Sequence, residues 1–162
     1  MSMKLQALII GLVILVADQL SKLAALKYFA EAPVEVLPFF NFVLVWNRGV
    51  SFGIFSNAHD YGPYILAALS LAVVVGLAFW MRSVSYKPLF IALACVIAGA
   101  FGNVIDRLVH GAVVDFLDFH IGAWHYPAFN IADSAIVLGI AFVIVDSIFL
   151  EPKRNKAETK DA

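Results

Sequence analysis

Long apolar segments alternate with shorter polar stretches along the chain. Four of the apolar segments have the length of a membrane span, and they cover residues 5–28, 63–81, 88–107 and 131–150. A transmembrane α-helix needs ~20 consecutive apolar residues. The pattern therefore predicts an all-α membrane protein with four transmembrane helices in a single domain, over residues 1–152. Residues 153–162 form a charged tail without aromatic residues, which we expect to be cytoplasmic and disordered.

The two longer connections, about residues 30–62 and 108–130, are too apolar for fully solvated loops. The first contains two runs of aromatic and β-branched residues on either side of Asn47-Arg48-Gly49, which is typical of a β-hairpin. The second contains a strand-compatible run over residues 113–119. Because aromatic side chains favour the membrane interface, we expect a small extracytoplasmic β element that lies on the bilayer.

Composition supports membrane residence and limits the possible partners. Of the 162 residues, 62% are hydrophobic and only 14% are charged, with a mean hydropathy of +0.90, whereas soluble domains average about 25% charged residues. The formal net charge of −1 leaves no basic footprint for nucleic acid, which we do not expect as a partner. The single cysteine, Cys95, excludes an intrachain disulfide and a thiolate-cluster metal site.

Positive residues in the short flanks predict the orientation, because cytoplasmic loops are enriched in Lys and Arg. One side of the membrane would carry seven of them: Lys4, Arg82, Lys87, Lys153, Arg154, Lys156 and Lys160. Both termini should therefore be cytoplasmic, and the two longer connections should lie outside.

A few polar side chains fall inside the apolar segments, where each ionisable group is costly and is by default a functional candidate. A rise of ~1.5 Å per residue puts Asp18 roughly 20 Å from the start of its segment, towards the outer side. Asn103 lies at a similar depth in the third segment, and Asn130 and Asp133 lie at the outer end of the fourth. Polar groups of three helices thus converge on one level.

These residues also have purely structural explanations. Asp18 and Lys22 are four residues apart and could form an ion pair that only steadies the bundle. Asn130 could cap the fourth helix, with Asp133 complementing the helix dipole. The four histidines all fall in connections and are weak evidence for zinc: His59, His110, His120 and His125.

A catalytic explanation comes from the adjoining connection, where Asp115 and Asp118 lie. Either carboxylate could pair with Asp133 and share a proton with it, so that one member activates water while the other acts as an acid. Such a dyad could hydrolyse an amide without a metal or a cofactor. The residues alone also leave open a small proton-coupled transporter or assembly factor with Asp18, Lys22 and Asp133 as a relay.

Five motifs, in order along the chain, resemble those of bacterial lipoprotein signal peptidase, or signal peptidase II. They are Asp18-Gln19-Leu20-Ser21-Lys22, Asn47-Arg48-Gly49 with Phe52-Gly53, Gly99-Ala100-Phe101-Gly102-Asn103 with Asp106-Arg107, Val113-Val114-Asp115-Phe116, and Phe129-Asn130-Ile131-Ala132-Asp133-Ser134. The resemblance spans nearly the whole chain. It implies a four-helix membrane aspartic peptidase with an extracytoplasmic β-cradle, in the bacterial cytoplasmic (inner) membrane. We expect a monomer with its active site near the outer leaflet.

The resemblance also assigns roles to residues. It implies that Asp115 and Asp133 are the catalytic dyad. Spacing alone does not decide whether Asp115 or Asp118 pairs with Asp133. The other implied site residues are Asn47, Asn103, Arg107 and Asn130 for substrate binding, with Asp18 and Lys22 as structural support. The implied partners are membrane lipid and a prolipoprotein whose cysteine carries diacylglycerol, cut on the amino side of that cysteine. No metal or cofactor is expected.

Overall fold

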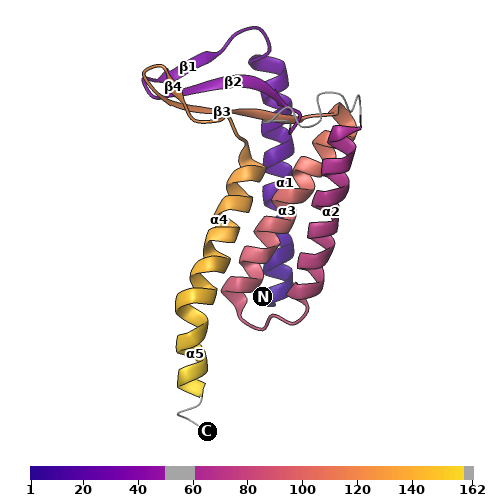
Figure 1. The fold of residues 1–162 in the computed structure, drawn as a ribbon, viewed down its shortest axis with the longest axis vertical. Helices are drawn as coiled ribbons and strands as arrows, with labels where there is room; N and C mark the ends of the chain where they lie inside the picture. Colours follow the sequence, from indigo (N-terminus) through magenta and orange to yellow (C-terminus); the bar gives the residue numbers. More distant parts are fainter. Residues whose placement is uncertain (50–60, 159–162) are drawn as a thin grey trace.

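A computed structural model, which describes residues 1–49 and 61–158, has four long helices below a small sheet (Figure 1). The helices are α1 Met3–Tyr28, α2 Gly62–Met81, α3 Lys87–His110 and α4 Ile131–Val145. α4 continues through a π-helical turn, η1 Asp146–Leu150, into α5 Glu151–Glu158. Four helices of the described residues are long and apolar enough to cross a membrane, as the hydropathy pattern predicts; the fourth runs from α4 through η1 into α5.

The helix ends follow from local sequence. Ser2 caps α1, since its hydroxyl accepts a hydrogen bond from the Leu5 N–H at 3.3 Å. α3 continues to His110, three residues beyond the predicted end at Arg107, and stops where Gly111 adopts φ +69°. This left-handed conformation is the usual C-terminal stop for glycine.

α3 is the central helix and contacts α1, α2 and α4. It packs closely on α4 because both helices present glycine at the contact. A Cβ at Gly99 would overlap the Ala132 carbonyl oxygen, and a Cβ at Gly139 would lie 2.8 Å from the Ala92 carbonyl oxygen. Small residues allow helix backbones to approach in this way, and here they bring the first turn of α4 against α3.

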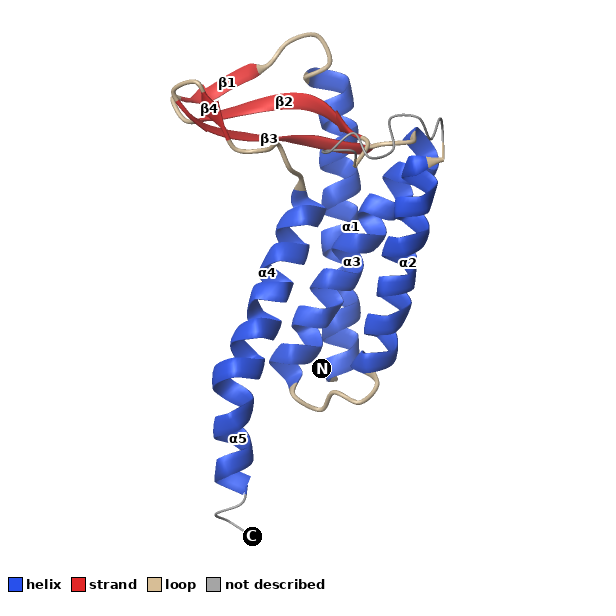
Figure 2. Cartoon of the chain, in the orientation of Figure 1, coloured by secondary structure: helices blue, strands red, loops and turns tan. Residues whose placement is uncertain are grey.

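The sheet is antiparallel, with strand order β1-β2-β3-β4 (Figure 2). The strands are β1 Val34–Leu37, β2 Phe40–Asn47, β3 Val113–Ile121 and β4 Trp124–His125. Strand β2 pairs with β1 and with β3, and a hairpin turn joins β1 to β2. The second run of the predicted hairpin, over residues 50–55, lies outside the described residues. Val114 and Phe116 of β3 pack with Ala25 of α1 and join the sheet to the helices.

The chain after residue 150 is helical up to Glu158, whereas the sequence predicts disorder from residue 153. The physical reason is a contact that the sequence does not reveal. Arg154 binds the buried carboxylate of Asp146 through two hydrogen bonds, of 2.6 and 3.0 Å, and its guanidinium lies 3.8 Å from the centre of the Tyr86 ring. The tail is thereby fixed to the α2–α3 connection.

Candidate active site

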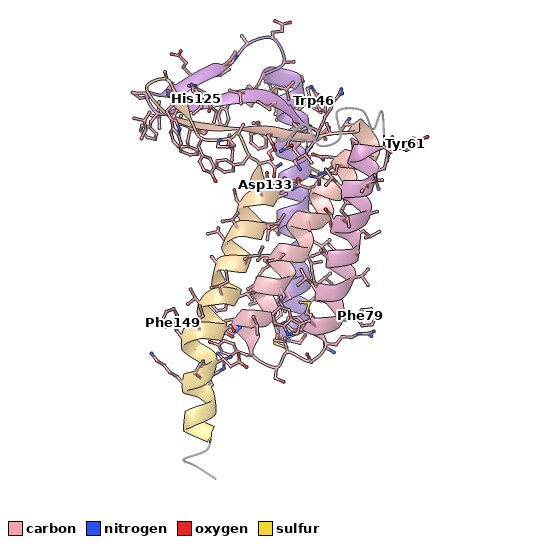
Figure 3. All side chains as sticks on the ribbon, in the orientation of Figure 1. Trp46, Tyr61, Phe79, His125, Asp133 and Phe149 are labelled. Atoms are coloured by element: carbon pink, nitrogen blue, oxygen red, sulfur yellow. The ribbon has the colours of Figure 1, made fainter. Side chains whose placement is uncertain are left out.

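The two implied catalytic aspartates come from different elements that meet at the junction of helices and sheet. Asp115 is the third residue of β3 and is 1% exposed. Asp133 is the third residue of α4 and is half-buried. Figure 3 shows Asp133 at the end of α4 nearest to the sheet. One carboxylate is therefore carried by the sheet and the other by the helix bundle.

Two asparagine side chains hold Asp115. The Asn47 amide donates to Oδ2 at 2.9 Å, and the Asn130 amide donates to Oδ1 at 2.8 Å. Burial raises the pKa of the Asp115 carboxyl to about 6; the hydrogen bond from Asn47 opposes this rise, and the nearby charge of Asp133 adds to it. Asp115 thus retains a proton more readily than an ordinary aspartate.

Asp133 is held by Asn103 and by the start of its own helix. The Asn103 amide donates to Asp133 Oδ1 at 2.7 Å, and the Asn130 backbone N–H donates to Oδ2 at 3.3 Å. In return the Asn130 side chain accepts from the Asp133 N–H at 2.8 Å, which completes a capping box. The capping interpretation of Asn130 and Asp133 is therefore correct, and the same bonds connect the two aspartates through Asn130.

A buried ion cluster lies directly behind these asparagines. Lys22 Nζ lies 2.8 Å from Asp18 and 2.9 Å from Asp106, and it donates to Asn103 Oδ1 at 3.0 Å. Because Lys22 occupies the amide oxygen of Asn103, the amide nitrogen is turned towards Asp133. The Asp18–Lys22 pair therefore orients a residue that contacts Asp133, beyond steadying the bundle.

The carboxylates of this cluster also bind the backbone of α4 and β3, the two elements that carry Asp133 and Asp115. Asp18 Oδ1 accepts from the Ala132 N–H at 2.9 Å, and Asp106 Oδ2 accepts from the Val114 N–H at 3.0 Å. Each bond fixes the residue next to one aspartate of the dyad. Sequence reasoning missed this role of Asp106, although its spacing of three residues from Asn103 places both on one face of α3.

Arg107 lies at the edge of the site and is half-buried. Its Nη1 makes one long contact, 3.4 Å to the Asn103 carbonyl oxygen, and its buried Nε has no hydrogen-bond partner among the described residues. Its charge interacts with those of Asp133 and Asp115. Within the described part of the chain the guanidinium thus makes few hydrogen bonds, and it carries a positive charge near the two carboxylates.

Asp118, the alternative to Asp115, belongs to a different group of residues. It accepts hydrogen bonds from Asn41 at 3.1 Å and from His125 at 2.9 Å. Burial would raise its pKa, but these hydrogen bonds outweigh that effect and lower it. Among the described residues, no group of three or more His, Cys, Asp or Glu side chains is arranged to hold a metal ion.

The amino-acid sequence matches a family of known proteins. The family model described as Signal peptidase (SPase) II matches residues 10–149. The chain belongs to the signal peptidase II family. The lipoprotein signal peptidase of Burkholderia cenocepacia is 48% identical over 141 residues, which cover 86% of this chain and 85% of that protein. The lipoprotein signal peptidase of Burkholderia mallei is 44% identical over the same shares of both chains.

A solved structure supports the fold of this signal peptidase II family member. A bacterial membrane enzyme superposes with a TM-score of 0.78 at 27% sequence identity, over 90% of this chain and 94% of that one. Together with the four apolar helices, the match makes the chain a multi-pass membrane protein. The predicted fold class, four transmembrane helices with a small β element, is confirmed.

Proposed function

We propose that the chain is an aspartic endopeptidase that removes the signal peptide from diacylglyceryl-modified prolipoproteins, on the amino side of the lipidated cysteine. Membership of the signal peptidase II family supports a protease that acts on prolipoproteins. The observation that carries the aspartic mechanism is the connection of Asp115 and Asp133 through Asn130, whose side chain and backbone N–H bind one carboxylate each.

In the proposed mechanism the dyad works with one proton. Asp115 holds it, because burial raises its pKa to about 6, and Asp133 acts as the base. Asp133 takes a proton from water as the water oxygen attacks the scissile carbonyl carbon, and Asp115 donates its proton to the carbonyl oxygen. Collapse of this intermediate breaks the C–N bond; the leaving amine takes the proton from Asp133, and Asp115 regains one from the hydroxyl group.

Four further residues bind the substrate or position the dyad. Arg107 binds a carbonyl or lipid oxygen of the substrate with its planar guanidinium, which makes only one long hydrogen bond within the described part of the chain. Asn47, Asn103 and Asn130 hold the two carboxylates. The ion cluster of Asp18 and Lys22 supports them from behind.

The distribution of positive residues supports a location in the bacterial cytoplasmic membrane, with both termini cytoplasmic. In this orientation the sheet and the dyad lie near the outer leaflet. A precursor held by its lipid and its apolar signal helix presents its scissile bond at that level.

The decisive experiment compares Asp115→Asn and Asp133→Asn with the unaltered protein on a diacylated precursor peptide. Each substitution should lower the cleavage rate by about 100-fold or more, because general acid–base catalysis contributes about that much. Glu35→Gln, which removes an exposed carboxylate from β1, is the matched control and should cleave normally. Normal turnover by either dyad variant would exclude the aspartic mechanism.

The transporter alternative gains no support. The comparisons favour a peptidase, and Asp146, the buried carboxylate at the opposite end of α4, is bound by Arg154. Ion flux in proteoliposomes without peptide cleavage would reverse this assessment.

A further inference from the structure

An apolar groove runs along the contact of α1 and α3, in the half of the bundle far from the sheet. It has a volume of about 380 Å³, and its lining is apolar except for Lys4. We call it the α1–α3 groove; its lining includes Lys4, Gly11, Leu15, Phe90, Ala98 and Phe101. Figure 1 shows the N-terminus and the α2–α3 connection at this end of the bundle.

Small residues form the floor of the α1–α3 groove and larger residues form its rim. Ala94 and Ala98 of α3 are buried, and a Cβ at Gly11 of α1 would lie 3.7 Å from the Ala98 Cβ. Leu12 and Phe101 also line the groove, and both are exposed. The groove is therefore open on the surface of the bundle, where a membrane protein meets lipid.

The length of the groove matches one leaflet of a bilayer. Its lining extends from Lys4 to Leu15 on α1 and from Phe90 to Phe101 on α3. Each stretch is ~16 Å long at a rise of ~1.5 Å per residue, and the hydrocarbon core of a bilayer is ~30 Å thick. An acyl chain of one leaflet can follow this distance, whereas a spanning helix needs about twice as much.

The end of the groove far from the sheet is positively charged. Lys4 lines the groove, and Lys87 precedes Phe90 by three residues, which places both on the same side of α3. Neither lysine forms a salt bridge within residues 1–49 and 61–158. Two cations at the end of an apolar groove complement the phosphate of a lipid headgroup. A signal peptide begins with a positively charged segment, which the two lysines would repel.

From this combination of length and charge we propose that the α1–α3 groove binds a phospholipid with an anionic headgroup. One acyl chain lies against Gly11 and Ala98, and the phosphate lies at Lys4 and Lys87. In the proposed orientation this lipid belongs to the cytoplasmic leaflet, whereas the dyad lies near the outer leaflet. The lipid site is therefore separate from the candidate active site and does not depend on the proposed peptidase activity.

The first test measures the preference for an anionic headgroup. The purified full chain in detergent is titrated with dioleoyl phosphatidylglycerol or dioleoyl phosphatidylcholine, which have the same acyl chains, and bound lipid is counted by native mass spectrometry. Each lysine should contribute about fivefold in affinity for the anionic lipid. Lys4→Gln should therefore reduce the preference about fivefold, and the double variant with Lys87→Gln should bring it close to one.

The second test fills the groove. Gly11→Leu should lower the affinity for both lipids by about tenfold or more, because each CH₂ kept out of an apolar site weakens binding. Gly76→Leu is the matched control and should bind as the unaltered protein does, because Gly76 lies on α2 outside the groove and a Cβ there meets no atom within 4 Å. Lys153→Gln is the matched charge control, since it removes an exposed lysine of α5 that does not line the groove.

Three results would overturn the lipid site. Equal affinity of the unaltered protein for the two lipids would exclude a preference for an anionic headgroup. A preference that survives in the double lysine variant, or that Lys153→Gln also abolishes, would place the anionic lipid elsewhere. If Gly11→Leu keeps phosphatidylglycerol but loses a synthetic signal peptide, the groove belongs to the signal helix. The lysine variants change only exposed side chains, so they decide the matter even if Gly11→Leu does not fold.

Discussion

The pKa of the Asp115 carboxyl group depends on its immediate neighbours. Burial favours the protonated form, while the hydrogen bonds from Asn47 and Asn130 and the charge of Lys22 favour the ionised form. The resulting pKa of about 6 lies well above that of an exposed aspartate, near 3.8. A carboxyl group with this balance can exchange a proton near neutral pH, as a general acid must.

This balance predicts the pH dependence of cleavage. The proposed mechanism requires a protonated Asp115, so kcat/KM should fall as the pH rises above about 6. Asn47→Ala removes a hydrogen bond that lowers this pKa, so the pKa should increase and the fall should move to higher pH. A pH–rate profile of both proteins measures the shift, with Glu35→Gln as a control expected to follow the unaltered profile. If the fall in kcat/KM of Asn47→Ala moves to lower pH, or does not move, the group that titrates is not Asp115.

At the scale of the elements, the site depends on the close approach of α4 to α3. Gly99 faces the Ala132 carbonyl, one residue before Asp133, and Asn103 lies one turn further along the same helix. The 2.7 Å hydrogen bond between Asn103 and Asp133 therefore requires glycine at position 99. The small residues of α3 serve both packing and the geometry of the dyad.

Gly99→Ala should therefore destabilise the protein and slow cleavage. Its Cβ would force α4 away from α3, at a cost of about 1–3 kcal/mol in the free energy of unfolding. Gly76→Ala is the matched control, because a Cβ at Gly76 of α2 meets no atom within 4 Å, and alanine favours a helix. Thermal unfolding in detergent measures both variants. Equal stability of the two would contradict the packing argument.

At the scale of the whole molecule, Asp133 lies in the first turn of α4, next to the sheet, and the Asp146–Arg154 pair lies beyond the other end of α4, in η1 and α5. The distribution of Lys and Arg then predicts which end faces which side of the membrane. Charge decides the orientation, because the apolar spans themselves have no preferred direction.

Cysteine labelling tests this orientation in a Cys95→Ala background. Ser85→Cys lies in the exposed α2–α3 connection and should be shielded from an impermeant reagent added outside the cell. Glu31→Cys, at an exposed position between α1 and β1, should react with the same reagent. Labelling of Ser85→Cys alone would invert the orientation and place the sheet in the cytoplasm.

The sequence by itself determined the spans and the level of the polar residues, because hydropathy and helical rise act locally along the chain. The pairing of β2, the role of Asp106 at Lys22 and the contact of Arg154 with Asp146 needed the tertiary structure. Each of these interactions either joins residues that are distant in sequence or depends on which side chains point towards one another. The sequence also did not decide whether Asp115 or Asp118 is the partner of Asp133. Three residues along one strand separate these carboxylates, and only packing assigns one to Asn130 and the other to His125.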